Sequence, residues 1–170
     1  MKIIEKNKKI ILDADVIIHF FKAGHLGLLT QIYPNKLYLV KDVLTEVFKG
    51  KLRNQIENSI RMKFIEELDF STDMKVLSEY AKLKRQYGPG ESACLAYCKF
   101  NNDVLASSNL KDIKKYCEDN NIQYLTTLDF LNTAYENDLL NKADCDYFIY
   151  NVTSQGSKLP VASIEEFRNL

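Results

Sequence analysis

The sequence predicts a three-layer α/β domain, in which a central parallel sheet of about four to five strands is flanked by helices. One pattern along the chain supports this fold class. Short β-branched apolar runs, too short for helices, alternate along the chain with longer segments of helical periodicity. That alternation is typical of parallel sheets with helices on both faces. The 170 residues are enough for one domain with its own core.

The strands are predicted at residues 10–12, 37–40, 64–68, 104–106 and 122–125. The first is the best marked, because Ile10, Ile11 and Leu12 form an apolar run that is typical of a strand buried on both faces. Between the strands, apolar residues at helical spacing predict two short helices over 15–33, one from Asp42 towards Arg61, and others over 76–83, from Glu91, over 110–117 and from Thr127 through Ala134.

We expect residues 1–140 to form the main domain and residues 141–170 to form a C-terminal helix and tail packed on it. No internal repeat separates the chain into smaller units.

The composition excludes several classes of protein. Lysine plus arginine equals aspartate plus glutamate at 23 each, so any basic surface for nucleic acid must be local. The four cysteines form no C-x-x-C pair, which favours a reduced, cytoplasmic protein. Asp13 and Asp15 interrupt the first apolar run, so a signal peptide is not expected. No stretch approaches the roughly 20 apolar residues of a membrane span, and no membrane partner is expected.

Asp13 is the first candidate site residue, because it follows the best-marked strand. In open α/β sheets, ligands bind at the carboxyl ends of the strands. A carboxylate there is costly to desolvate unless a cation accompanies it, and a divalent metal is a common partner. Asp15 could belong to the same site, or it could equally be the N-cap of the helix that begins with Val16.

Two glutamates could join Asp13 at the same edge of the sheet. Glu46 lies in an otherwise apolar helix start, and Glu91 follows Gly88-Pro89-Gly90. Each has an ordinary explanation, since Glu91 suits a helix N-terminus and Glu46 a solvated helix face. Together with Asp13, however, they would supply the hard oxygen ligands that Mg²⁺ or Mn²⁺ prefers.

Four stretches in this order resemble the PIN-domain family of metal-dependent ribonucleases, best known as toxins of bacterial toxin–antitoxin pairs. They are Ile11–Ile17, Val43–Val47, Gly90–Ala96, and Leu105–Asn109 running on to Tyr124–Leu128. The resemblance covers about residues 8–140, and its specificity comes from the order and spacing of the four motifs together.

The resemblance implies that Asp13, Glu46 and Glu91 are catalytic acids and that Asp13 and Glu91 bind the metal. Asp15 and Ser108 would support the site. The family usually has one or two aspartates where this chain has Ser107, Ser108 and Asn109. Asn109 offers an amide oxygen but no charge. Asp112 could supply the missing carboxylate if its helix begins early.

The expected activity is hydrolysis of RNA with Mg²⁺ or Mn²⁺. The basic residues Lys49, Lys51 and Arg53 follow Glu46 and could hold an RNA backbone, although such clusters more often form a solvated face. An antitoxin protein and a second copy of the chain are further candidate partners.

Two other functions remain open from the sequence. Asp13-Ala14-Asp15 after an apolar strand also matches the opening motif of aspartyl-phosphate phosphatases, with Asp13 as nucleophile and Asp15 as acid or base. That function gives Glu46 and Glu91 no role. The other alternative is a catalytically weakened PIN-like binding module, as Asn109 suggests.

Overall fold

The protein is described by a computed structural model that covers residues 4–47 and 49–170, without the side chains of Glu46 and Val47. Its described strands form one five-stranded sheet in the order β3-β2-β1-β4-β5, and every pairing is parallel. This arrangement confirms the predicted fold class. The strands are β1 (Ile10–Leu12), β2 (Leu37–Val40), β3 (Glu66–Leu68), β4 (Val104–Ala106) and β5 (Tyr124–Leu125).

Strand β1 is the centre of the sheet. Ile11 lies beside Tyr38 of β2 on one side and beside Leu105 of β4 on the other. All three residues of β1 are fully buried, as their β-branched and apolar side chains require. The outer strands β3 and β5 each begin two residues later than the sequence indicated and end where it predicted.

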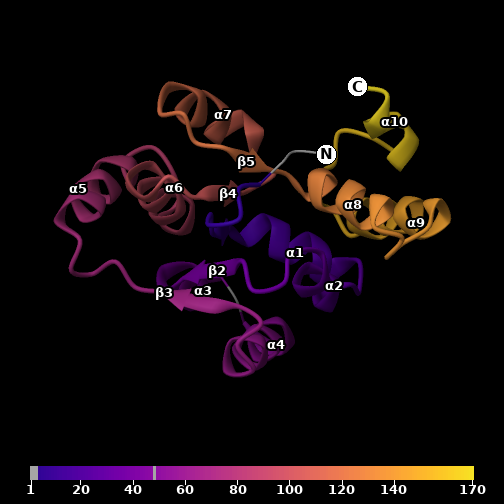
Figure 1. The fold of residues 1–170 in the computed structure, drawn as a ribbon, viewed down its shortest axis with the longest axis horizontal. Coiled ribbons are helices and arrows are strands. Elements are labelled where there is room, and N and C mark those ends of the chain that lie inside the picture. Colours follow the sequence, from indigo (N-terminus) through magenta and orange to yellow (C-terminus); the bar gives the residue numbers. More distant parts are fainter. Residues whose placement is uncertain (1–3, 48) are drawn as a thin grey trace.

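Helices cover both faces of the sheet. They are α1 (Ala14–Lys22), α2 (Leu26–Ile32), α3 (Lys41–Val47), α4 (Gly50–Arg61), α5 (Met74–Leu83), α6 (Pro89–Asn101), α7 (Leu110–Asp119), α8 (Thr127–Glu136), α9 (Lys142–Ser154) and α10 (Ile164–Arg168). Figure 1 shows α5, α6 and α7 on one side of the sheet and α1, α2 and α4 on the other. The chain changes face after β3, when it returns past β1 to form β4. Strands β1 and β4 therefore meet where the strand order reverses.

The predicted helix from Asp42 to Arg61 is wrong in one respect, because it is two helices. Helix α3 ends at Val47 and α4 begins at Gly50, which has a φ of +59°. Glycine adopts this left-handed conformation without the steric cost that other residues meet, so a turn forms here. Asp42 lies in the first turn of α3, which already begins at Lys41, and is not its N-cap.

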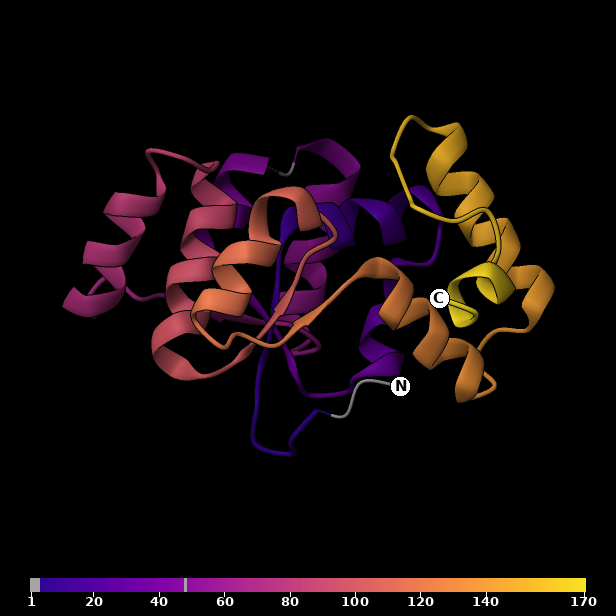
Figure 2. The same cartoon turned by 90° about the horizontal axis from the view of Figure 1, so that it is seen from above.

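The C-terminal segment packs on the rest of the chain through α8, α9 and α10, which lie together at one end of the molecule (Figure 2). The ring centroid of Phe148 in α9 lies 4.8 Å from that of Phe20 in α1, and Phe20 also contacts Phe130 in α8. The predicted tail contains the short helix α10, whose Arg168 donates a hydrogen bond to Asn132 (2.7 Å).

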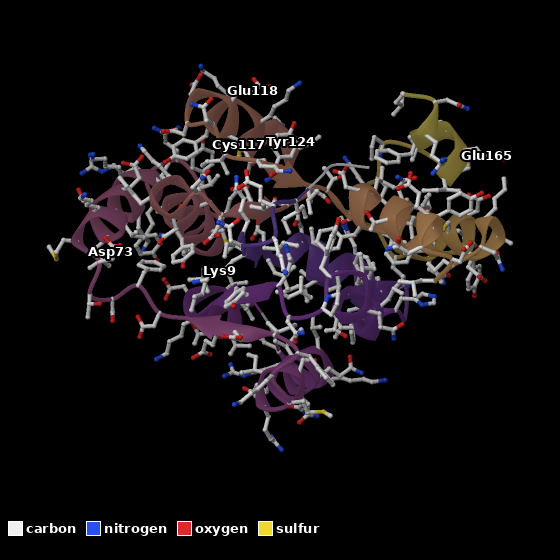
Figure 3. The ribbon with its side chains drawn as sticks, viewed as in Figure 1. Lys9, Asp73, Cys117, Glu118, Tyr124 and Glu165 are labelled. Atoms are coloured by element: carbon white, nitrogen blue, oxygen red, sulfur yellow. The ribbon has the colours of Figure 1, made fainter. Side chains whose placement is uncertain are left out.

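All four cysteines are buried and unpaired in the structure. Figure 3 shows Cys117 on the inner side of α7 and Glu118 on its outer side. Among the described helices, none combines the length and apolar character that a membrane span needs.

Truncation of Phe148 tests whether the C-terminal segment shares the main core. We expect Phe148→Ala to lower the free energy of unfolding by about 3–5 kcal/mol within a single cooperative transition, because the buried ring leaves a cavity. Urea denaturation measures this loss. Tyr147→Ala is the matched control, since Tyr147 is 61% exposed and its loss should change stability by less than about 1 kcal/mol. Two separate transitions would show instead that the segment unfolds independently.

Candidate active site

Asp13 lies at the carboxyl end of β1 and at the start of α1. Its backbone N–H donates to Ala106 O of β4 (2.9 Å), which extends the pairing of the two strands by one residue. Its Oδ1 accepts from the N–H of Ala14 (2.7 Å), and the side chain is buried with 6% of its surface exposed. Asp13, and not Asp15 as the sequence allowed, is the N-cap residue, because the helix begins directly after the strand.

Asp15 joins α1 to the segment that follows β4. Its Oδ2 accepts from the N–H of Ser108 (2.7 Å) and from the hydroxyl of Ser107 (3.4 Å). Its Oδ1 accepts from the N–H of Val16 (2.6 Å). Both carboxylate oxygens are therefore held, and Asp15 fixes the two adjacent strand ends relative to each other.

Glu91 reaches this edge from α6, which lies on the opposite face of the sheet from α1 (Figure 1). Helix α6 begins at Pro89, with Gly88 at the N-cap, so Glu91 lies in the first turn rather than at the start. A Cβ at Gly90 would lie 3.2 Å from Cγ2 of Val43, so glycine allows α6 to approach α3 closely. Helix α3 also carries Glu46, whose side chain lies outside the described part of the structure.

Asn109 connects two acids across the site. Its Nδ2 donates to Oε1 of Glu91 (3.2 Å) and to Oδ2 of Asp112 (2.7 Å). The amide nitrogen, and not the carbonyl oxygen considered from the sequence as a metal ligand, faces these carboxylates. Asp112 lies in the first turn of α7 and so belongs to the same edge of the sheet as Glu91.

The acids are close enough to affect one another's charge. Burial, and then the negative charge of Asp13, raises the pKa of Asp15 to about 7. Burial, followed by the charges of Asp13 and Asp112, raises the pKa of Glu91 to about 7. Burial also raises the pKa of Asp13. Among the described residues, no lysine or arginine forms an ion pair with Asp13, Asp15 or Glu91.

The donor chemistry of this cluster fits a hard divalent cation, because its negative charge is not balanced by a described basic side chain. In the described part of the chain, however, no three His, Cys, Asp or Glu side chains form a ready metal-binding group. These findings are compatible for Mg²⁺, which commonly keeps several waters and takes only one or two protein carboxylates.

A buried polar network beneath the acids was missed from the sequence. The hydroxyl of Ser108 donates to Oγ1 of Thr127 (2.8 Å) and accepts from the N–H of Thr127 (2.8 Å). Nδ1 of His19 lies 2.8 Å from the same Oγ1. Burial lowers the pKa of His19 to about 4. The network joins α1, the end of β4 and α8. Its signal in the sequence was the position of Thr127, two residues after the last residue of β5.

The three basic residues expected to hold the RNA backbone differ in their surroundings. Arg53 donates from Nε to Glu57 (2.7 Å), so its charge is locally paired. Lys49 and Lys51 are exposed at the beginning of α4. Lys51 forms no ion pair with a described carboxylate.

The fold and the site together define an α/β domain with an acidic cluster at the carboxyl edge of a parallel sheet. A comparison with known protein families matches DUF3368, a PIN domain family, over residues 9–162. The chain belongs to this PIN-domain family, which confirms the resemblance and extends it past residue 140. Comparisons with curated proteins and with solved structures gave no match.

The raised pKa of Glu91 predicts how stability depends on pH. Between about pH 4.5 and 7 the folded protein binds more protons at Glu91 than the unfolded chain does, so this group reduces stability as the pH rises through that window. We expect Glu91→Gln to remove this contribution, so that the metal-free variant loses less stability than the wild type over the window.

Urea titrations at pH 4.5, 5.5, 6.5 and 7.5 in EDTA measure the difference. Glu67→Gln is the control, since Glu67 is an exposed glutamate on β3. Parallel pH profiles for the wild type and Glu91→Gln would contradict the raised pKa of Glu91.

Proposed function

We propose that this protein is a metal-dependent endoribonuclease that hydrolyses RNA phosphodiester bonds with Mg²⁺ or Mn²⁺. One observation carries the proposal: in a PIN domain, Asp13 and Asp15 at the start of α1 and Glu91 in the first turn of α6 meet at the carboxyl edge of the sheet. Burial, and then the charge of Asp13, raises the pKa of both Asp15 and Glu91 to about 7. A cation stabilises the ionised form of carboxylates that repel one another and have no basic partner. A bound divalent ion also leaves coordination positions for substrate phosphate.

Each acid has a distinct role in this proposal. Asp13 and Glu91 would hold the ion, directly or through water, and Glu46 would orient a water molecule. Asp15 would fix the site through its bonds to Val16 and Ser108. When bound, the ion would lower the pKa of a water molecule and stabilise the charge that develops during hydrolysis.

Asn109 would reduce the affinity for metal. It adds no negative charge, and its amide hydrogens occupy oxygens of Glu91 and Asp112. Because a hard cation is bound largely by ligand charge, the protein would need a high metal concentration. Mn²⁺ would be favoured over Mg²⁺, which dehydrates reluctantly.

The same residues distinguish the proposed ribonuclease from the two alternative functions. An aspartyl-phosphate phosphatase needs Asp15 as a mobile acid or base, but both of its oxygens accept backbone hydrogen bonds. A binding module without activity is supported only by Asn109. A role as the toxin of a toxin–antitoxin pair, an antitoxin partner and a homodimer stay predictions from the resemblance.

Loss of Asp13 gives the direct test of the proposed activity. With a structured RNA pool and millimolar Mn²⁺, we expect cleavage that EDTA abolishes and that Asp13→Asn reduces at least roughly 100-fold, since even residues outside the metal's own ligands change activity 10- to 100-fold. Asp119→Asn, an exposed aspartate on α7, is the control. Mn²⁺ should also raise the melting temperature of the wild type but not of Asp13→Asn. Equal cleavage by wild type and Asp13→Asn would refute the site.

A pair of variants tests the fourth position. Asn109→Asp restores a charge between Glu91 and Asp112, so it should lower the Mn²⁺ concentration that gives half-maximal cleavage. Asp112→Asn removes a neighbouring charge and should raise that concentration, roughly 10- to 100-fold if Asp112 supports the ion. Metal titrations of cleavage measure both. If neither variant shifts the titration of an Asp13-dependent activity, the ion does not bind near Asn109.

A further inference from the structure

A pocket of about 470 Å³ lies between the α1–α2 junction and α4. Its lining includes Phe21 and Gly27 on one side and Lys51, Gln55 and Asn58 on the other. The volume falls within the range of pockets that hold small organic groups, about 300–1,000 Å³. The acid cluster contributes no residue to this lining.

We propose that this pocket binds one unpaired nucleobase of the RNA chain that the acid cluster cleaves. The inference rests on the proposed ribonuclease function and goes beyond it, because it assigns a base-binding subsite outside the acid cluster and the residues that form it.

Phe21 provides an aromatic ring at the pocket. Its neighbour Phe20 is fully buried and packs on Phe148, whereas Phe21 remains half-buried and lies outside the hydrophobic core. Proteins that bind unpaired RNA bases commonly stack them on such rings. A half-exposed ring at a pocket therefore has surface available for a base.

The opposite wall of the pocket is polar and lies on one face of α4. Lys51, Gln55 and Asn58 follow the i, i+4, i+7 spacing that places side chains on the same side of a helix. The side-chain amides of Gln55 and Asn58 have no hydrogen-bond partner among the described residues. Each amide offers both donors and an acceptor, which base edges require. Lys51 offers a positive charge for the adjoining phosphate.

Helix α1 connects the pocket to the acid cluster. Ala14, Ile18 and Phe21 share one face of this helix, and all three are partly exposed. Phe21 comes six residues after Asp15, which is about 9 Å along a helix axis. An RNA strand that lies along this face could place a phosphate at the acids and a nearby base in the pocket.

Gly27 allows the pocket to be filled without disturbing the fold. A Cβ built at this position meets no atom within 4 Å, and its backbone is not in the left-handed region. A larger side chain would therefore extend into open space beside the pocket. It should also favour helix α2, because glycine is a poor helix former.

The experiment measures RNA binding in the absence of cleavage. A fluorescently labelled single-stranded RNA of mixed sequence and a duplex RNA of the same composition are titrated with the full chain carrying Asp13→Asn, in EDTA. We expect added Phe21→Ala to weaken single-strand binding roughly 5- to 150-fold, the effect of losing one base–aromatic stack, and to leave duplex binding nearly unchanged. Gly27→Met should weaken single-strand binding similarly without lowering thermal stability.

Two control variants should bind both RNAs as the parent does. Gly27→Ala adds a Cβ that touches nothing, and Tyr147→Ala removes an exposed ring of α9 that does not line the pocket. Lys51→Ala should weaken both RNAs and reduce the salt dependence of binding, since it removes a phosphate contact.

The outcomes separate the pocket from the activity. Unchanged single-strand binding in both Phe21→Ala and Gly27→Met, or equal losses for single strand and duplex, would overturn the pocket. If those variants bind normally while cleavage depends on Asp13, the ribonuclease function is supported and the base pocket is refuted. Pocket-dependent binding without any cleavage would support the pocket and refute the activity, and no binding of either RNA would refute both.

Discussion

The burial of strand β1 is the constraint on which the rest of the molecule depends. Its three apolar residues have no exposed surface, so the strand must lie between β2 and β4 with helices over both faces. Because β1 ends at Leu12, the next residue is placed at the carboxyl edge where the strand order reverses. Asp13 therefore lies at the crevice that this class of sheet forms, and its N–H continues the pairing with β4.

The acids gathered at that edge oppose the stability of the metal-free fold. Burial and repulsion from neighbouring acids raise the pKa of Asp15 and of Glu91 to about 7, so ionising either group costs more in the folded protein than in the unfolded chain. Hydrogen bonds offset part of this cost, from Ser108 to Asp15 and from Asn109 to Glu91. A bound cation would relieve the repulsion more completely, so stability and the proposed activity are coupled through the same side chains.

The same helix serves the acid cluster and the proposed base pocket. Helix α1 follows its N-cap residue Asp13 and carries Phe21 close to its end, so its rigid length fixes the distance between the two sites. Helix α4 completes the pocket. It can do so because a turn at Gly50 separates α3 from α4 and changes the direction of the chain. A continuous helix would direct residues 50–61 elsewhere. The turn that the sequence did not predict is therefore a condition for the second site.

The sequence by itself determined the strands, most of the helices and the positions of Asp13 and Glu91 along the chain. These features follow from local apolar patterns and from carboxylates beside strand or helix ends. Only the tertiary structure decided that Asp13 takes the N-cap, that the amide of Asn109 bridges Glu91 and Asp112, and that His19 reaches Ser108 through Thr127. The physical reason is that Asn109 and Glu91 are 18 positions apart and His19 and Thr127 are 108 apart, and local pattern carries no information on which distant groups meet. The N-cap depends on where β1 ends, which its pairing with the distant strand β4 sets.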